Sequence, residues 1–206
     1  MIGKVLVISG PSGVGKTTLM NYLVSVDPNI FVPISYTTRA PRPGEVNGKD
    51  YFFISKTEFE KLIAANEFAE WAIVHDNYYG KLFKTINEAI INGKDVCIIS
   101  DIQGLNRYKN LFPFAFFVSI LPQSLAALQD NMERRGDNSE EINKRMRNAI
   151  NEMLFEFPYN KIIVNRVGLQ DYAKQEIFTY FFREINAPQY LFHQKCVSNL
   201  LNGKSI

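Results

Sequence analysis

The segment that decides the fold lies near the N-terminus and reads KVLVISGPSGVGKT, from Lys4 to Thr17. It opens with a short apolar run rich in β-branched side chains, residues 4–9, which is typical of a strand buried on both faces of a parallel sheet. A glycine-rich turn follows directly, and helical spacing of apolar side chains then runs from Lys16 to about Val26. This order of strand, turn and helix predicts the first unit of an α/β fold.

The turn at residues 10–17, here called the P-loop, has the composition of a loop that cradles phosphate groups. It fits the pattern G-x-x-x-x-G-K-[ST] with Gly10, Pro11, Ser12, Gly13, Val14, Gly15, Lys16 and Thr17. Glycines let backbone N–H groups converge on phosphate oxygens, and the helix N-terminus adds its dipole. The Lys16 ammonium can reach the β- and γ-phosphates, and the Thr17 hydroxyl can bind Mg²⁺. An incidental glycine-rich turn is the alternative, but the flanking strand and helix favour binding of a nucleoside triphosphate.

Strand and helix patterns alternate along the rest of the chain. We expect further buried strands at residues 96–100, 114–120 and 161–165, and helices at 85–92, 105–110, 124–134, 139–155 and 169–185. This alternation predicts a parallel sheet covered by helices on both faces. Asp101 directly follows the strand at 96–100 and is the natural second ligand for Mg²⁺, directly or through water. A helix cap is the other reading of Asp101, and the two roles are compatible.

Residues 34–80 interrupt the alternation. They contain a basic loop at 37–45, short half-buried strands near 51–54 and 68–74, and a helix near 57–65. Hairpin-like strands and a helix placed between parallel-sheet elements predict a small α+β sub-domain inserted into the core.

The inserted segment also carries polar residues suited to a second substrate. They are Ser35, Arg39, Arg42, Tyr51 and Tyr79, and arginine is the residue type suited to bidentate phosphate recognition. Solvated loop charge explains the two arginines equally well when they are taken alone. Glu70 is harder to explain in that way, because a carboxylate in an apolar strand is costly unless it is paired. In a pocket, a carboxylate can accept two N–H bonds from the edge of guanine, which adenine does not offer.

Composition limits the classes of function. The chain has 206 residues with 23 Lys and Arg against 21 Asp and Glu, and a net charge of +2 argues against nucleic-acid binding through bulk positive charge. No apolar run approaches the ~20 residues that a membrane span needs. No secretory signal is visible, so we expect a cytoplasmic protein with neither nucleic acid nor membrane as partner. Cys97 and Cys196 lack metal-ligand spacing and are expected to be reduced thiols.

Several motifs, taken in order, resemble those of the guanylate kinase family of nucleoside monophosphate kinases. The similar stretches are GPSGVGKTT at 10–18, SYTTRAPRPG at 35–44, EVNGKDY at 45–51, FAEWAIVHDNYYG at 68–80, SDIQG at 100–104 and RGDNSEEINKR at 135–145. The resemblance runs from about residue 3 to residue 186. It implies a P-loop core, a GMP-binding insert and a mobile helical lid. It also implies phosphoryl transfer from ATP to GMP, and to dGMP, with Mg²⁺.

The resemblance implies roles for individual residues. Those that hold GMP are Ser35, Arg39, Arg42, Glu45, Tyr51, Glu70, Tyr79, Lys81 and Asp101. Within this set, Glu45 orients the arginines and Glu70 reads guanine. ATP is bound by Gly10, Pro11, Ser12, Gly13, Val14, Gly15, Lys16, Thr17, Thr18 and Arg135. The implied catalytic residues are Lys16, Arg39, Arg135 and Arg145, and the implied metal ligands are Thr17 and Asp101.

Arg135 and Arg145 resemble the lid arginines that close over the ATP phosphates, and Arg134 and Arg147 are further candidates. Arg145 has a second reading as a surface residue paired with Glu141 one helical turn away, an interaction worth only ~0.3–0.5 kcal/mol.

The chain departs from the family pattern at four positions. Lys81 stands where Ser or Thr is usual, and Ile99 replaces the first acid of a D-x-D pattern. Asn131 replaces an arginine, and Arg166 stands where Asp is common. An ammonium group at position 81 can still donate to guanine O6, so the changes bear on rate and base selectivity more than on the class of reaction.

Two other functions fit parts of the pattern. Guanylate-kinase-like domains also serve as non-catalytic protein-binding scaffolds, but these typically lose the working P-loop, which is intact here. A related P-loop kinase for a phosphorylated sugar would not need Glu70 or the tyrosine pair. We expect one domain over 1–206, monomeric or homodimeric. Its parts are a core at 1–33, 81–125 and 157–186, a GMP-binding insert at 34–80, a lid at 126–156 and a C-terminal extension at 187–206.

Overall fold

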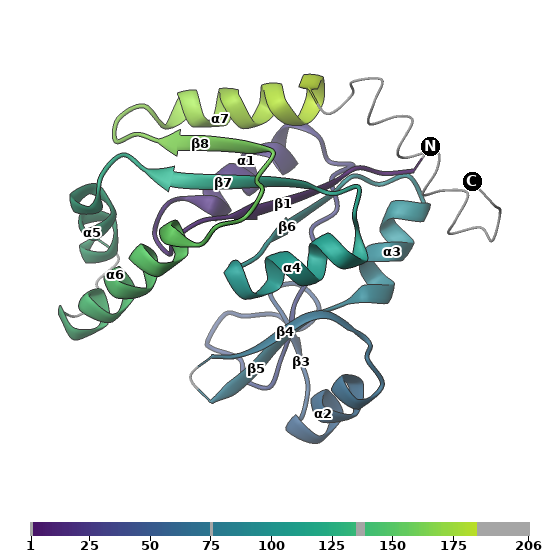
Figure 1. Cartoon of the computed structure of the whole chain (residues 1–206). Helices are drawn as coiled ribbons and strands as arrows, with labels where there is room; N and C mark the ends of the chain where they lie inside the picture. Colours follow the sequence, from purple (N-terminus) through teal and green to yellow (C-terminus); the bar gives the residue numbers. More distant parts are fainter. Residues whose placement is uncertain (1, 75, 135–138, 185–206) are drawn as a thin grey trace.

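The computed structural model describes residues 2–74, 76–134 and 139–184 and contains two sheets (Figure 1). The central sheet has the strand order β6-β1-β7-β8, and all its neighbouring strands are parallel. The bounds are Val96–Ile99 for β6, Val5–Ser9 for β1, Phe116–Pro122 for β7 and Lys161–Asn165 for β8. All four expected strands are therefore present, and the predicted parallel α/β sheet is confirmed. The expectation that the strand at 161–165 is buried is wrong, because β8 lies at the edge of the sheet and only Ile163 is buried.

Helices cover both faces of this sheet, as the sequence predicted. Helices α1 (Lys16–Val26) and α7 (Gln170–Thr179) lie on one face, and α3 (Phe83–Ile91) and α4 (Ile102–Leu111) lie on the other. Alternation along β1 explains the two hydrophobic cores: Leu6 and Ile8 pack with α1 and α7, whereas Val5 and Val7 pack with α3 and α4. Burial on both faces accounts for the continuous apolar run in β1.

The second sheet is mixed and has the strand order β3-β2-β5-β4. The bounds are Tyr36–Thr37 for β2, Phe52–Phe53 for β3, Phe68–Val74 for β4 and Asn77–Leu82 for β5, with α2 at Lys56–Ala64. Strands β4 and β5 form an antiparallel hairpin. The sequence patterns did not predict β2 or β5, because β2 has two residues and β5 combines polar side chains with Gly80.

Two further helices, α5 (Leu125–Glu133) and α6 (Ser139–Leu154), follow β7. They lie on the side of the molecule toward which the arrowheads of β7 and β8 point (Figure 1). Helix α7 continues into a π-helical turn at Tyr180–Glu184. The expected extension at 187–206, including Cys196, falls outside the described residues.

Local signals set where the helices begin. Helix α4 begins at Ile102 rather than at residue 105, because the Asp101 side chain caps it. Helix α3 begins at Phe83, two positions before the expected start. Cys97 is buried in the core without a disulfide, and burial raises the pKa of its thiol to about 12. In the described part of the chain, no helix is long and apolar enough to cross a membrane.

Candidate functional site

The P-loop joins the end of β1 to the first turn of α1. Gly15 is the N-cap residue with a φ of 99°, a conformation that favours glycine. A Cβ atom on Gly10 would lie 2.1 Å from the carbonyl oxygen of Ile120, so only glycine fits beside β7. Lys16 Nζ donates to the carbonyl oxygens of Gly10 and Pro11. The loop thus presents a lysine and the first N–H groups of α1 in the arrangement predicted for phosphate binding.

Two asparagines outside the P-loop hold its carbonyl groups. Asn165, at the end of β8, donates from Nδ2 to the Val14 oxygen at 2.8 Å. Asn131, on α5, donates to the Gly13 oxygen at 3.3 Å. These two bonds use carbonyl oxygens of the loop and none of its N–H groups, so they do not compete with an anion for those N–H groups. Neither asparagine was predicted from the sequence to belong to the site, because both lie more than a hundred positions from the loop.

A cavity of about 370 Å³, here called the central cavity, opens beside the P-loop. It is lined by Ser12, Lys16, Ser35, Glu70, Trp71, Ala72, Val74, Tyr79, Gly80, Lys81, Ile99, Ser100, Asp101, Gln103, Gly104, Arg107 and Glu152. These residues come from the P-loop, the residue before β2, the β4–β5 hairpin, the end of β6, α4 and α6. The structure therefore brings seven of the predicted site residues to one cavity: Ser12, Lys16, Ser35, Glu70, Tyr79, Lys81 and Asp101.

Glu70 forms the centre of a polar network in this cavity. Lys81, its cross-strand partner, donates from Nζ to Glu70 Oε1 at 2.7 Å, and both side chains are about 15% exposed. Ser100 donates from Oγ to Glu70 Oε2 at 2.9 Å. Lys81 also donates to the carbonyl oxygen of Ile99 at 3.3 Å. The expectation that a carboxylate in this strand needs a partner is therefore satisfied.

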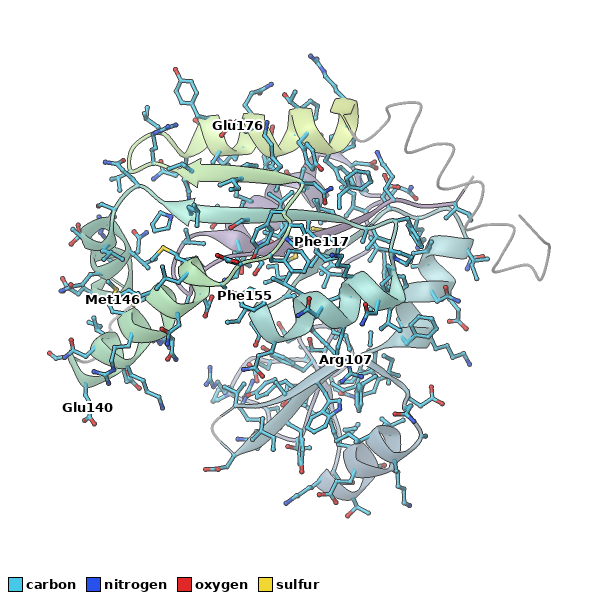
Figure 2. All side chains as sticks on the ribbon, in the orientation of Figure 1. Arg107, Phe117, Glu140, Met146, Phe155 and Glu176 are labelled. Carbon is cyan, nitrogen blue, oxygen red and sulfur yellow. The ribbon has the colours of Figure 1, made fainter. Side chains whose placement is uncertain are left out.

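Two residues of α4, Tyr108 and Arg107, interact with strand β4 near this network. The Tyr108 side chain is fully buried, and burial together with the nearby charge of Glu70 raises its phenol pKa well above the ordinary value. Arg107 extends from α4 on the side of the second sheet (Figure 2) and donates to the carbonyl oxygen of Phe68 at 3.2 Å. These contacts join the second sheet to the central one at the cavity.

A second group of predicted residues surrounds Arg39. Its guanidinium donates from Nη2 to both carboxylate oxygens of Glu45, at 2.7 and 2.9 Å, and lies 5.5 Å from the centre of the Tyr51 ring. The backbone N–H of Arg42 donates to Glu45 Oε2 at 2.7 Å. Hydrogen bonds from Arg39 and from the Arg42 backbone lower the pKa of Glu45. The Tyr51 and Tyr79 rings meet edge to face at 5.9 Å, and Tyr79 links this group to the central cavity.

The two predicted metal ligands line different hollows, and Lys16 of the P-loop lines both. Asp101 Oδ1 accepts from the backbone N–H groups of Gln103 and Gly104, both at 3.0 Å, so the helix-cap reading is confirmed. Thr17 is exposed at the first turn of α1 and lines a hollow with the rest of the P-loop. Among the described residues, no three His, Cys, Asp or Glu side chains form a metal cage. One hydroxyl and one carboxylate fit Mg²⁺ bound mainly by waters and phosphates.

The lid arginines that the structure describes, Arg134, Arg145 and Arg147, do not line the central cavity. Arg135 lies outside the described residues, and Arg145 lies half-buried on α6, away from the cavity lining that the described residues form. Arg134, at the end of α5, lines a second hollow of about 280 Å³ beside the P-loop, together with Asn131, Asn165 and Lys174. Glu152, on α6, lines the central cavity and was not singled out from the sequence.

Comparison with known proteins agrees with this arrangement. The family model described as guanylate kinase matches residues 2–175, which include the P-loop, both sheets and α6. The chain belongs to the guanylate kinase family. The resemblance drawn from the sequence motifs is therefore confirmed.

Individual members of the guanylate kinase family match most of the chain. A guanylate kinase of Carboxydothermus hydrogenoformans is 43% identical over 164 residues, 79% of this chain and 80% of that protein. A guanylate kinase of Hydrogenovibrio crunogenus is 38% identical over 97% of this chain and 98% of its own length. The crystal structure of guanylate kinase from Anaplasma phagocytophilum has a TM-score of 0.68 at 28% identity and covers 91% of this chain and 88% of that one.

Proposed function

We infer that the chain is a guanylate kinase that transfers the γ-phosphoryl group of ATP to GMP, yielding ADP and GDP. The observation that carries this function is that Lys16 of the P-loop and the paired Glu70 carboxylate line one cavity. A phosphate-binding loop and a group able to read guanine thus face a common space, which is what direct transfer between two nucleotides requires. Membership of the guanylate kinase family supports the same reaction.

For the acceptor, we propose that Glu70 accepts the guanine N–H groups while Lys81 and Asp101 line the same end of the cavity. The phosphate of GMP would be held by Ser35, Arg39, Arg42, Tyr51 and Tyr79. The bidentate bond between Arg39 and Glu45 supports this role, because it fixes the planar guanidinium before the substrate arrives. Glu45 acts through Arg39 and is a positioning residue in this scheme.

For the donor, residues 10–18 would bind the ATP phosphates, and Lys16 would leave its carbonyl partners for the β- and γ-phosphates. Thr17 and Asp101 would hold Mg²⁺, which when bound neutralises developing charge on the transferred group. The hollow lined by Asn131 and Arg134 offers room for the ATP nucleoside. Because little covalent chemistry falls to the protein, catalysis consists of positioning and charge neutralisation.

Two anionic substrates must meet without water reaching the transferred group. We propose that the insert at 34–80 and the lid at 126–156 close over them, with Arg135 and Arg145 neutralising the ATP phosphates. This division of the chain, and both arginine roles, rest on the resemblance to the family. Closure would bring Arg145, which does not line the central cavity in the structure, to the ATP phosphates.

A coupled assay of ADP formation tests the reaction. GMP, dGMP, AMP, CMP and UMP are compared as acceptors in the presence of Mg-ATP. We expect rapid turnover with GMP, measurable turnover with dGMP, and little with AMP or the pyrimidine nucleotides. The absence of GMP-dependent ADP formation would instead favour a protein-binding scaffold, and a preference for another acceptor would point to a kinase of different specificity.

A further inference from the structure

Glu152 is a carboxylate of the central cavity that the proposed reaction does not use. It lies near the end of α6, is half-buried, and lines the cavity together with residues of the β4–β5 hairpin. Glu70 is bonded to Lys81 and Ser100, and Asp101 caps α4. Among the described residues, Glu152 is the cavity carboxylate to which no side chain or backbone group donates. A half-buried carboxylate without an internal partner is costly, and a ligand donor would offset that cost.

Glu152 lines the central cavity together with Lys16 of the P-loop and with Glu70 and Asp101. Its negative charge interacts with Lys16, which belongs to the phosphate-binding end, and with Asp101. Asp101 directly follows Ser100, which donates to Glu70 at the base-binding end. Burial and Asp101 raise the pKa of Glu152, whereas Lys16 opposes that shift. Glu152 therefore lies within electrostatic reach of one residue from each end.

The chemistry of a nucleotide decides what Glu152 can meet there. Base, sugar and phosphate are joined in that order, so the sugar of an acceptor that spans the cavity lies between the two ends. Phosphate oxygens would repel a carboxylate, and the base already faces Glu70 and Lys81. Sugar hydroxyl groups are neutral donors, and a hydrogen bond from a hydroxyl to a carboxylate is among the stronger kinds in proteins.

We propose that Glu152 accepts a hydrogen bond from a sugar hydroxyl of the acceptor nucleotide and so contributes to selectivity between ribose and deoxyribose. The proposal rests on the proposed function, because it takes the central cavity as the acceptor site. It gives α6 a direct contact with the acceptor, in addition to the contacts made by the second sheet. The lid helix then detects the acceptor sugar as well as the donor phosphates.

The test is a set of thermodynamic cycles, each of which combines one substitution in the protein with the removal of one hydroxyl group from the nucleotide. Affinities of GMP, 2′-deoxy-GMP and 3′-deoxy-GMP are measured by calorimetry without ATP, and kcat/KM is measured with ATP, for the wild type and for Glu152→Leu. We expect removal of the contacted hydroxyl to lower the affinity and the kcat/KM of the wild type about tenfold. The same removal should lower both quantities less than twofold in Glu152→Leu. Glu152→Gln, which keeps the shape, should show an intermediate penalty and serves if Glu152→Leu does not fold.

Glu156→Gln is the matched control, since Glu156 is exposed just beyond the same helix and does not line the cavity. Glu156→Gln should lose as much affinity as the wild type when the contacted hydroxyl is removed from the nucleotide. The proposal would be overturned if each deoxy nucleotide lost as much affinity with the Glu152 variants as with the wild type. It would also be overturned if the wild type bound GMP and both deoxy nucleotides equally well. In those cases GMP turnover would still support the kinase. A wild type that neither binds nor phosphorylates GMP would instead refute the proposed function itself.

Discussion

A Cβ atom at position 104 would lie 2.0 Å from Oε2 of Glu70 and 2.2 Å from Oγ of Ser100. Gly104 belongs to the first turn of α4, where its N–H group donates to Asp101. The missing side chain is therefore what allows the Glu70 carboxylate to reach from the second sheet to Ser100 at the end of β6. Any other residue at 104 would occupy the space that the carboxylate needs.

Gly104→Ala should weaken GMP binding without affecting ATP binding. The methyl group displaces Glu70 from Ser100, and a hydrogen bond to a charged group is worth about 1.5–3 kcal/mol, so kcat/KM for GMP should fall about 10- to 100-fold. Calorimetry with each nucleotide separates the two sites. An equal loss of ATP affinity would show that the substitution disturbs the fold as a whole rather than the position of Glu70.

Lys81→Met should destabilise the protein by about 2–3 kcal/mol, because it leaves the largely buried Glu70 carboxylate without its ion-pair partner. The matched control is Lys84→Met: Lys84 is 74% exposed and pairs with Glu88 at 3.9 Å, so its loss should cost about 0.5 kcal/mol or less. Urea unfolding of both variants measures the difference. Similar losses in the two variants would contradict a stabilising role for the Glu70–Lys81 pair.

The sequence predicted those parts of the site that lie close together along the chain. The P-loop follows from glycine spacing between an apolar strand and a helix, and Glu70 attracted notice as a charge in an apolar strand. Both inferences use neighbouring residues, for which periodicity and composition are informative. The central sheet was predicted for the same reason, since its buried strands β1 and β6 are short runs of mainly apolar residues.

The remaining features depend on contacts between distant segments. Asn165 reaches Val14 across 151 positions, and Gly104 is required only because Glu70 packs against it. Strand β5 is stabilised by pairing with β4 and β2 rather than by its own pattern. Glu152 can be recognised as a site residue only from the fold, which brings α6 to the cavity. No local pattern distinguishes that glutamate from its exposed neighbours.

Asn165 should be a positioning residue for ATP. Asn165→Ala removes the 2.8 Å bond to the Val14 oxygen, and a neutral hydrogen bond worth about 1 kcal/mol predicts an approximately fivefold loss of ATP affinity. Asn165→Asp should cost more, because a carboxylate faces the carbonyl oxygen and also repels the incoming phosphates. Titration of each variant with an ATP analogue measures the two losses of affinity and shows which is larger. A smaller loss for Asn165→Asp than for Asn165→Ala would contradict this role.

Glu45 should keep Arg39 in place over most of the pH range. The bonds from Arg39 and from the Arg42 backbone lower the pKa of Glu45, so its contribution is complete above the ordinary glutamate pKa and is lost only as the pH falls through the lowered value. We expect the affinity for GMP to show no loss from this group until below about pH 4. Glu45→Gln should weaken GMP binding several-fold at pH 7, whereas Glu60→Gln, at an exposed position, should not.

Glu152→Gln should stabilise the protein at neutral pH. Burial first, and then Asp101, raise the pKa of Glu152, so the folded state favours the protonated form and stability is lost as the pH rises through this pKa. Glutamine removes the charge, so thermal unfolding should shift upward at pH 7 by less than about 3 °C, and the difference should vanish near pH 4. If Glu152→Gln were less stable than the wild type at pH 7, burial of the Glu152 charge would not be destabilising, and the prediction would be wrong. Greater stability together with weaker discrimination between GMP and its deoxy analogues would show that Glu152 serves substrate binding at the expense of folding.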